Sequence, residues 1–196
     1  TSLLQGGTLR IDTVHDRAYV FLDQAFLGLI GRARCSVTVE VPGSGVLDIL
    51  VESMGRLNYG AQMTDRKGIL GDVYMNGGVL QGWEMMRLGM KDLSNVQWKP
   101  VKEANEEAEK SGPAFYRSFV EIGETADTFI NPKGWTKGHI YANGFNLGRY
   151  WTVGPQLTLY VPEPLLRKGT NEFVSFEIRG TDRLTMSLDD VHQIDI

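Results

Sequence analysis

The sequence has a single cysteine, no long hydrophobic run and no marked excess of either charge. Cys35 alone excludes an internal disulfide, and its apolar neighbours favour a buried small side chain over a nucleophile. No stretch approaches the roughly 18 apolar residues of a membrane span. Lys and Arg number 20 against 24 Asp and Glu, for a net charge of −4. This balance gives no electrostatic basis for binding nucleic acid or an anionic membrane, so we expect neither as a partner.

Signatures of metal and cofactor chemistry are also missing. His15, His139 and His192 lack the spacing of a metal site, and we expect no metal and no cofactor. The first five residues do not form a signal peptide, and strand-like residues follow almost at once, so we expect the start to be a cut within a longer chain. The lack of an Asn-X-Ser/Thr sequon favours a bacterial over a lysosomal source.

Short apolar segments divided by turn residues predict an all-β chain. The expected strands are residues 9–13, 18–22, 26–28, 36–41, 47–52, 69–75, 79–88, 138–142 and 157–161. Asn143-Gly144 predicts a two-residue hairpin turn, because both positions need a positive φ. After it, Leu147-Gly148 is expected to swing the chain into an aromatic turn at residues 149–151. A polar segment at about 99–112 predicts a short exposed helix, and the tail 181–196 is expected to pack or to add an edge strand.

The two halves of the chain repeat each other. Residues 19–28 align without a gap on residues 139–148, and residues 45–52 align on residues 170–177. Two repeated blocks in the same order predict the duplication of one β-sandwich unit. Glu52 and Glu177 then occupy equivalent positions of two domains, which argues against a catalytic pair of carboxylates.

Six segments carry a family resemblance: VHDRAYVFLDQAFLG, LDILVESMGRLNYG, DRKGI, GWTKG, NGFNLGRYW and GPQLTLYVP. In this order they resemble the C-terminal β-domains of family 35 β-galactosidases, over most of residues 9–178. The resemblance implies two galactose-binding-like jelly-roll domains, about residues 1–88 and 89–196. In that family two glutamates on an N-terminal (β/α)₈ barrel do the chemistry. A barrel needs about 250 residues, so we expect no catalytic residue in this chain of 196.

The expected function is therefore that of a non-catalytic portion of an enzyme that removes terminal β-galactose. It would brace the missing barrel, line the substrate cleft and meet carbohydrate only through the parent enzyme. An autonomous galactose- or glycan-binding module is the alternative. A structural or protein-interaction role unrelated to sugar is the third.

Tyr59 is the leading candidate for substrate binding, with Arg56 and Asn58 beside it in the segment GRLNYG. An aromatic face stacks on the C–H face of a sugar, while amide and guanidinium groups bond its hydroxyls. In similar enzymes this loop faces the mouth of the barrel. Alternatively, Tyr59 packs and its hydroxyl caps a backbone group, while Arg56 and Asn58 hold the loop or form ion pairs with the barrel.

A second candidate surface is an aromatic sugar platform supplied with hydrogen bonds by an amide and a guanidinium group. Its proposed members are Trp135, Tyr150, Trp151, Asn143 and Arg149. Core or inter-domain packing is the alternative for its aromatic residues. Elsewhere, His15-Asp16-Arg17 is expected to fix a turn or a domain contact, and residues 65–68 to form a loop held by salt bridges.

Overall fold

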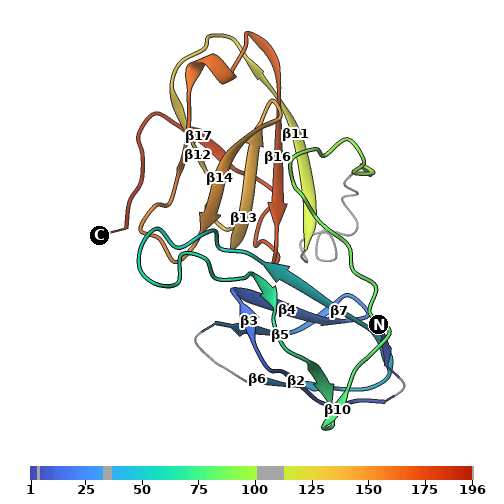
Figure 1. The fold of residues 1–196 in the computed structure, drawn as a ribbon. Helices are drawn as coiled ribbons and strands as arrows, with labels where there is room; N and C mark the ends of the chain where they lie inside the picture. The colour runs from blue at the N-terminus through green and yellow to red at the C-terminus, as the bar shows by residue number, and fades with distance from the viewer. Residues whose placement is uncertain (4, 33–36, 101–112, 196) are drawn as a thin grey trace. The chain divides into compact units, whose positions relative to one another are not determined.

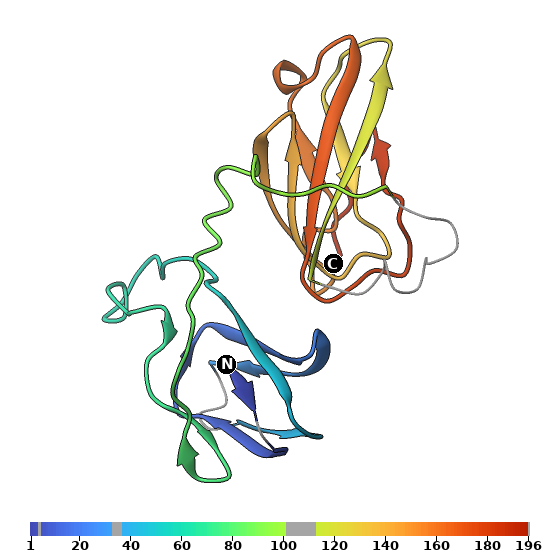
Figure 2. The same cartoon turned by 90° about the vertical axis from the view of Figure 1, so that its right-hand side faces the viewer.

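The computed structural model of the chain describes residues 1–3, 5–32, 37–100 and 113–195. They form two compact units, domain 1 (Thr1–Arg87) and domain 2 (Leu88–Ile196), both built of strands (Figures 1 and 2). Within these ranges the only helical segment is the 3₁₀ turn η2 (Glu163–Leu165), and no helix is long and apolar enough to span a membrane. The predicted all-β class is confirmed. Cys35 and residues 101–112 of the expected helix lie outside the described residues.

Domain 1 is built from short antiparallel strands. They are β1 (Ser2–Leu3), β2 (Gly7–Ile11), β3 (Val14–His15), β4 (Arg17–Leu22), β5 (Ala25–Gly31), β6 (Val37–Val41), β7 (Gly45–Glu52), β8 (Gly68–Ile69), β9 (Val73–Met75) and β10 (Gly78–Val79). One sheet has the order β1-β7-β4-β5, a second has the order β10-β9-β2-β6, and β3 pairs with β8.

The core of domain 1 lies between its two four-stranded sheets. Ala18 and Val20 of β4 join Leu47 of β7 in a buried cluster with Leu9 and Val73 of the other sheet. The strand β4 is central and its residues 18–22 are all buried, as its run of apolar residues predicts. This arrangement is a β-sandwich, in which the inner faces of both sheets supply the core.

Domain 2 repeats this plan. Its strands are β11 (Ala114–Ile122), β12 (Thr128–Asn131), β13 (Lys137–Ala142), β14 (Phe145–Trp151), β15 (Leu159–Val161), β16 (Gly169–Glu177) and β17 (Ser187–Asp189). Sheet β11-β16-β13-β14 and sheet β15-β12-β17 share a core that includes Ile130, Ile140, Leu159 and Phe173. The tail supplies the edge strand β17, as expected.

The repeated blocks form matching hairpins. Asp23-Gln24 joins β4 to β5 with φ of 47° and 72°, and Asn143-Gly144 joins β13 to β14 with φ of 49° and 83°. Both hairpins shift register at the same place, between residues 20 and 21 and between residues 140 and 141. The predicted turn at Asn143-Gly144 is confirmed, and the first repeated block forms the same hairpin in both domains.

Several strand predictions need correction. Leu147-Gly148 and residues 149–151 lie inside β14, where the extra residue is a β-bulge and not a turn. Of the expected strand 79–88, only Val79 lies in a strand ladder, opposite Tyr74 of β9. Leu80 N–H adds one bond to Val73 O at 2.8 Å, and residues 81–88 belong to no strand. The sequence did not predict the long strand β11. None of its residues is buried and residues 117–119 are exposed, because β11 lies at the edge of its sheet, so it lacks a clear apolar alternation.

The two glutamates are not at equivalent positions. Val51 pairs with Ala18, whereas Glu177 pairs with Gly138, which corresponds to Ala18 in the repeat. The alignment of β7 on β16 is therefore displaced by one residue in the ladders. A shift by one residue moves a side chain to the other face of a sheet, so Glu177 points into its core and Glu52 points away from the core of domain 1.

Candidate functional site

The loop between β7 and β8, residues 53–67, carries all three predicted substrate-binding residues. Its residues 55–64 are exposed throughout. Within this stretch the backbone closes small turns of its own, from Met63 N–H to Gly60 O at 3.3 Å and from Asp65 N–H to Gln62 O at 3.0 Å. Gly55 has a positive φ of 92°, which lets the chain leave the sheet sharply.

Tyr59 projects from this loop into solvent. Tyr59 is 81% exposed, compared with 48% for Tyr160 in domain 2. Arg56 and Asn58 are exposed as well. The structure thus places the three residues together on one loop and holds none of their side chains in the core. Packing of Tyr59 against domain 1, the alternative considered above, is not what the structure shows.

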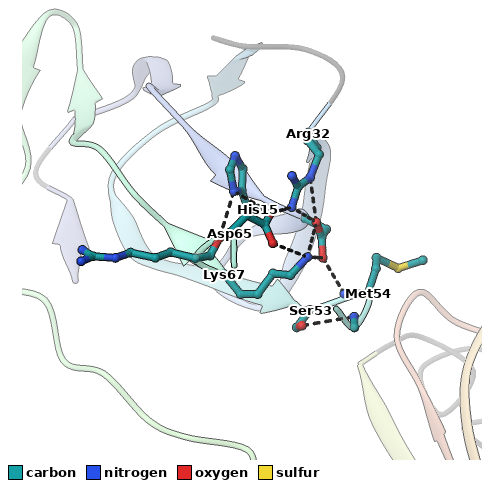
Figure 3. Close-up of polar contacts among 9 residues, drawn as sticks. His15, Arg32, Ser53, Met54, Asp65 and Lys67 are labelled. Carbon is teal, nitrogen blue, oxygen red and sulfur yellow. Dashed lines mark hydrogen bonds and ion pairs between the residues drawn. The ribbon is translucent and has the colours of Figure 1, made fainter. Parts of the chain in front are cut away.

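Asp16 ties the base of this loop to the sheet. It is 7% exposed and lies between β3 and β4. Its Oδ2 accepts the N–H of Met54 at 2.7 Å and the Lys67 ammonium at 3.0 Å. Its Oδ1 accepts Arg32 Nε at 2.8 Å, and its own N–H donates to Glu52 O at 3.3 Å. Both ends of the loop therefore meet at one carboxylate (Figure 3).

Asp65 completes the cluster from the loop itself. The Nη2 atom of Arg32 bonds to Asp16 and to Asp65, and Lys67 Nζ lies 3.5 Å from Asp65 Oδ1. His15 Nδ1 is 3.3 Å from Asp65 Oδ2 and 2.9 Å from the carbonyl oxygen of residue 66. The expectation of a salt-bridged loop at residues 65–68 is confirmed. His15 and Asp16 both bond to this loop, so the two features form one cluster (Figure 3).

The charges of this cluster are balanced. Burial disfavours the ionised form of Asp16, but hydrogen bonds from Met54 N–H, Lys67 and Arg32 outweigh it and lower the pKa of this carboxyl to about 2. A hydrogen bond from Arg32 lowers the pKa of Asp65. At neutral pH two carboxylates therefore face one guanidinium and one ammonium group. This pairing offsets the cost of removing these charges from water.

Glu52 and Glu177 are engaged separately, in different domains. Tyr19 donates to Glu52 Oε2 at 2.9 Å, and Tyr150 donates to Glu177 Oε2 at 2.9 Å. Burial, reinforced by the adjacent carboxylate, raises the pKa of both tyrosines, so they remain neutral donors. Each carboxylate serves its own domain as a hydrogen-bond acceptor.

Two members of the predicted aromatic platform are buried in domain 2, and a third, the half-buried Asn143, is bonded within it. Trp135 is 4% and Tyr150 is 3% exposed, and the indole N–H of Trp135 donates to Thr185 O at 3.0 Å. The Asn143 amide bonds to Leu165 O and Asn171 Oδ1, at 2.7 and 2.8 Å. These groups are occupied by the fold and present no face to a ligand.

The remaining two members lie on the other side of β14. Arg149 is exposed, and its guanidinium carbon is 5.7 Å from the ring centre of the half-buried Trp151. The Trp151 ring is also covered by Lys137 Nζ at 4.3 Å. The platform thus separates across the sheet, because alternate residues of a strand face opposite sides.

Sequence reasoning missed a different row of aromatic side chains in domain 2. Ring centres of Phe129 and Tyr160 are 5.5 Å apart, and those of Phe129 and His192 are 5.8 Å apart. Tyr160 is 48% exposed. The signal was the alternation of Phe129 with buried Ile130 and of Tyr160 with buried Leu159 and Val161.

The role of Arg32 in the Asp16 cluster carried no local signal in the sequence. Among the described residues, no group of three or more His, Cys, Asp or Glu could hold a metal ion.

Two family models match the chain. Residues 3–89 match the model described as "Beta-galactosidase, first all-beta domain". Residues 113–171 match the model described as "Beta-galactosidase, galactose-binding domain". The first match covers most of domain 1 and the first two residues of domain 2, and the second match lies within domain 2.

Curated relatives from plants, animals and bacteria are similar to the chain. Beta-galactosidase 17 of Arabidopsis thaliana is 38% identical over 96% of this chain and 31% of its own length. Beta-galactosidase-1-like protein 2 of Homo sapiens is 38% identical over 90% of the chain and 28% of its own length. A beta-galactosidase of Xanthomonas manihotis is 38% identical over 79% of the chain and 26% of its own length. The chain spans about a third or less of the length of these relatives.

Proposed function

Since this chain belongs to the β-galactosidase family, whose first all-β domain and galactose-binding domain it carries, we propose that it serves as the accessory, non-catalytic part of an enzyme that removes terminal β-galactose. In that enzyme it braces the catalytic barrel, and the loop 53–67 forms one wall of the substrate cleft. The bond is broken elsewhere, by the two glutamates that the family carries on its barrel. Galactose is released with retention of configuration.

The observation that carries this proposal is an exposed loop tip on an anchored base. Residues 55–64 are exposed, yet both ends of the loop are bonded to the nearly buried Asp16. Tyr59, with most of its surface in water, contributes little to the stability of domain 1. An exposed aromatic side chain on a loop whose ends are anchored is suited to stacking on a sugar.

Exposed apolar side chains support a role within a larger protein. On the loop, Leu57 is 40% and Met63 is 49% exposed; after β10, Met85 is 95% and Met86 is 87% exposed. Large apolar side chains left in water in this way are typical of surfaces that another protein part covers. The proposed cover is the barrel of the parent enzyme.

We assign Tyr59 to the leaving sugar of the substrate, not to the galactose that is cleaved off. Replacement of Tyr59 by Ala in the full-length enzyme should then raise KM or change linkage preference, while the two-glutamate chemistry persists. A stacking contact contributes about 0.5–1.5 kcal/mol, and tenfold corresponds to about 1.4 kcal/mol. The expected loss in kcat/KM for disaccharides is therefore about two- to twelvefold. The loss should be smaller for a chromogenic galactoside.

Kinetics of Tyr59→Ala on several disaccharides test the assignment, with Phe145→Ala as the matched control. Phe145 is an aromatic residue of domain 2 that is 55% exposed, whereas the loop 53–67 belongs to domain 1. Unchanged kinetics of Tyr59→Ala on every disaccharide would remove Tyr59 from the cleft. Equal losses in both variants would indicate a general effect of removing surface aromatics.

An autonomous glycan-binding module is the second candidate, and the row Phe129, Tyr160 and His192 favours it. Polar groups flank this row: Tyr160 bonds to Asp127, and Asp189 accepts Gln193 Nε2 at 3.2 Å. Calorimetric titration of the chain with galactose and lactose tests this role. Binding that is lost in Tyr160→Ala and kept in Tyr59→Ala and Phe145→Ala would support the module; no heat with either sugar would exclude it for these ligands.

A further inference from the structure

The loop that carries Tyr59 is fixed only at its base. Residues 60–65 form backbone hydrogen bonds within the loop itself, and residues 55–64 are exposed. By contrast, Met54 and Lys67, at the two ends of the loop, both donate to Asp16, at 2.7 Å and 3.0 Å. The direction in which the loop leaves the domain is thus set at one carboxylate.

The same carboxylate is held rigidly by the sheet. Asp16 precedes the central strand β4, its backbone N–H bonds to Glu52 O at 3.3 Å, and its backbone oxygen accepts Arg32 N–H at 2.9 Å. The guanidinium of Arg32, at the end of β5, bonds to its side chain. Three strands, β4, β5 and β7, therefore fix the position of the acceptor to which both loop ends bond.

Arg32 and Asp65 extend this anchor into the returning arm of the loop. Arg32 Nη2 bonds to Asp16 and to Asp65 at once, so one guanidinium links the sheet carboxylate to a loop carboxylate. Charge-assisted bonds of this kind are the stronger and more directional hydrogen bonds of proteins. The returning arm has two such attachments, Lys67 and Asp65, and the leaving arm has the N–H of Met54.

We propose that Asp16 is a positioning residue of the β-galactosidase, which clamps both ends of the loop 53–67 and so presents Tyr59 to the substrate. This inference rests on the proposed role of Tyr59 in the cleft. Asp16 does not touch substrate; it acts through the backbone of the loop. Loss of the clamp should widen the range of Tyr59 positions, which weakens a stacking contact without removing it.

The first arm of the test uses the 196-residue chain and needs no enzyme activity. Amide hydrogen exchange, followed by mass spectrometry, is compared for wild type, Asp16→Asn and Lys67→Gln. Asp48→Asn, an exposed carboxylate of β7, is the matched control. We expect several-fold faster exchange in residues 53–67 of the first two variants, with strands β2 and β4 still protected. Unchanged exchange in the loop of Lys67→Gln and Asp16→Asn overturns the clamp.

Lys67→Gln keeps the test decisive if Asp16→Asn unfolds domain 1. It removes one attachment and leaves Asp16 bonded to Arg32 and to the N–H of Met54. Its loop should still exchange faster than in wild type. Loss of protection in β2 and β4 to the same extent as in the loop would mean that the cluster holds the whole domain, and would contradict a specific positioning role.

The second arm is a double-mutant cycle in the full-length enzyme, with Lys67→Gln, Tyr59→Ala and the double variant assayed on a disaccharide. If Lys67 and Asp16 act through Tyr59, Lys67→Gln lowers kcat/KM several-fold in wild type and has no further effect after Tyr59→Ala. An equal loss in both backgrounds overturns the inference. If Tyr59→Ala alone changes nothing, the proposed cleft role fails, and the exchange data still decide whether the clamp exists.

Discussion

Replacing Glu177 by Gln should strongly destabilise domain 2. The Glu177 side chain has no exposed surface, and its two oxygens accept six hydrogen bonds. The donors are Thr136 N, Thr136 Oγ1, Lys137 N, Tyr150 Oη, Arg179 N and Gly180 N. Glutamine has the same shape but only one acceptor oxygen, so part of this set must lose its partner.

The magnitude follows from which bonds an amide can keep. The best orientation puts the amide oxygen at Oε1, which accepts from Thr136 Oγ1, Lys137 N, Arg179 N and Gly180 N. The amide nitrogen then replaces Oε2. Tyr150 can turn its hydroxyl to Phe176 O, 3.3 Å away, but Thr136 N–H, now bonded to Oε2 at 2.9 Å, cannot turn.

One part-buried backbone donor is therefore left without its partner, and such a loss costs about 1–3 kcal/mol. The four bonds that remain lose the assistance of the negative charge, which adds about 1 kcal/mol. We expect a loss of about 2–4 kcal/mol in the free energy of unfolding of domain 2.

Urea denaturation followed by tryptophan fluorescence measures this loss. Trp135 reports on the affected core, because its ring centre is 6.5 Å from that of Tyr150. The matched control is Glu124→Gln, an exposed glutamate of the same domain, for which a change within about 0.5 kcal/mol is expected. A loss below about 0.5 kcal/mol for Glu177→Gln would refute the reasoning, since it would mean that the carboxylate does not hold these donors.

Three further predictions follow from other parts of the chain. Gly144→Val should destabilise domain 2 by about 1 kcal/mol or more, because φ at Gly144 is 83°, although a Cβ there meets no atom within 4 Å. Gly31→Val, also in open space but without a positive φ, is the control in the same denaturation assay. Equal denaturation midpoints for the two variants would contradict the turn. The isolated chain should not hydrolyse a chromogenic β-galactoside; turnover abolished by Glu52→Gln or Glu177→Gln would overturn this. Folding lowers the pKa of Asp16 from 3.8 to about 2. Its stabilisation is therefore complete above about pH 5 and is lost as the pH falls through about 2. The stability difference between wild type and Asp16→Asn should shrink over that window, and a constant difference would exclude the cluster as its source.

Much of the fold was decided by local sequence. Asn143-Gly144 specifies a tight turn because Asn and Gly tolerate a positive φ, and the apolar run 18–22 specifies a central strand. The equivalent turn Asp23-Gln24 has the same backbone shape, although Gln24 has no such preference. The repeat of these segments was visible because a hairpin with its bulge is encoded within about ten consecutive residues. Tyr59, Asn58 and Arg56 were selected in the same way, as an aromatic residue and polar groups on one short loop, and the structure shows all three exposed there.

Other features were decided only by contacts between distant segments. The alignment of Glu52 with Glu177 placed them at one position, but the strand ladders differ by one residue, and that shift puts Glu177 in a core. Trp135 and Tyr150 looked like candidates for sugar binding, yet both lie in the core, since which face of a strand is covered depends on the opposing sheet.

The Asp16 cluster shows the same division. The sequence by itself predicted charged turns at His15-Asp16-Arg17 and at residues 65–68. It also showed that Tyr59 lies in the loop between β7 and residues 65–68. Only the tertiary structure brought Arg32 between Asp16 and Asp65, residues that are far apart in the chain. Ion pairs depend on distances of a few ångströms between side chains, and such distances are set by the packing of whole sheets, which no local pattern of residues encodes.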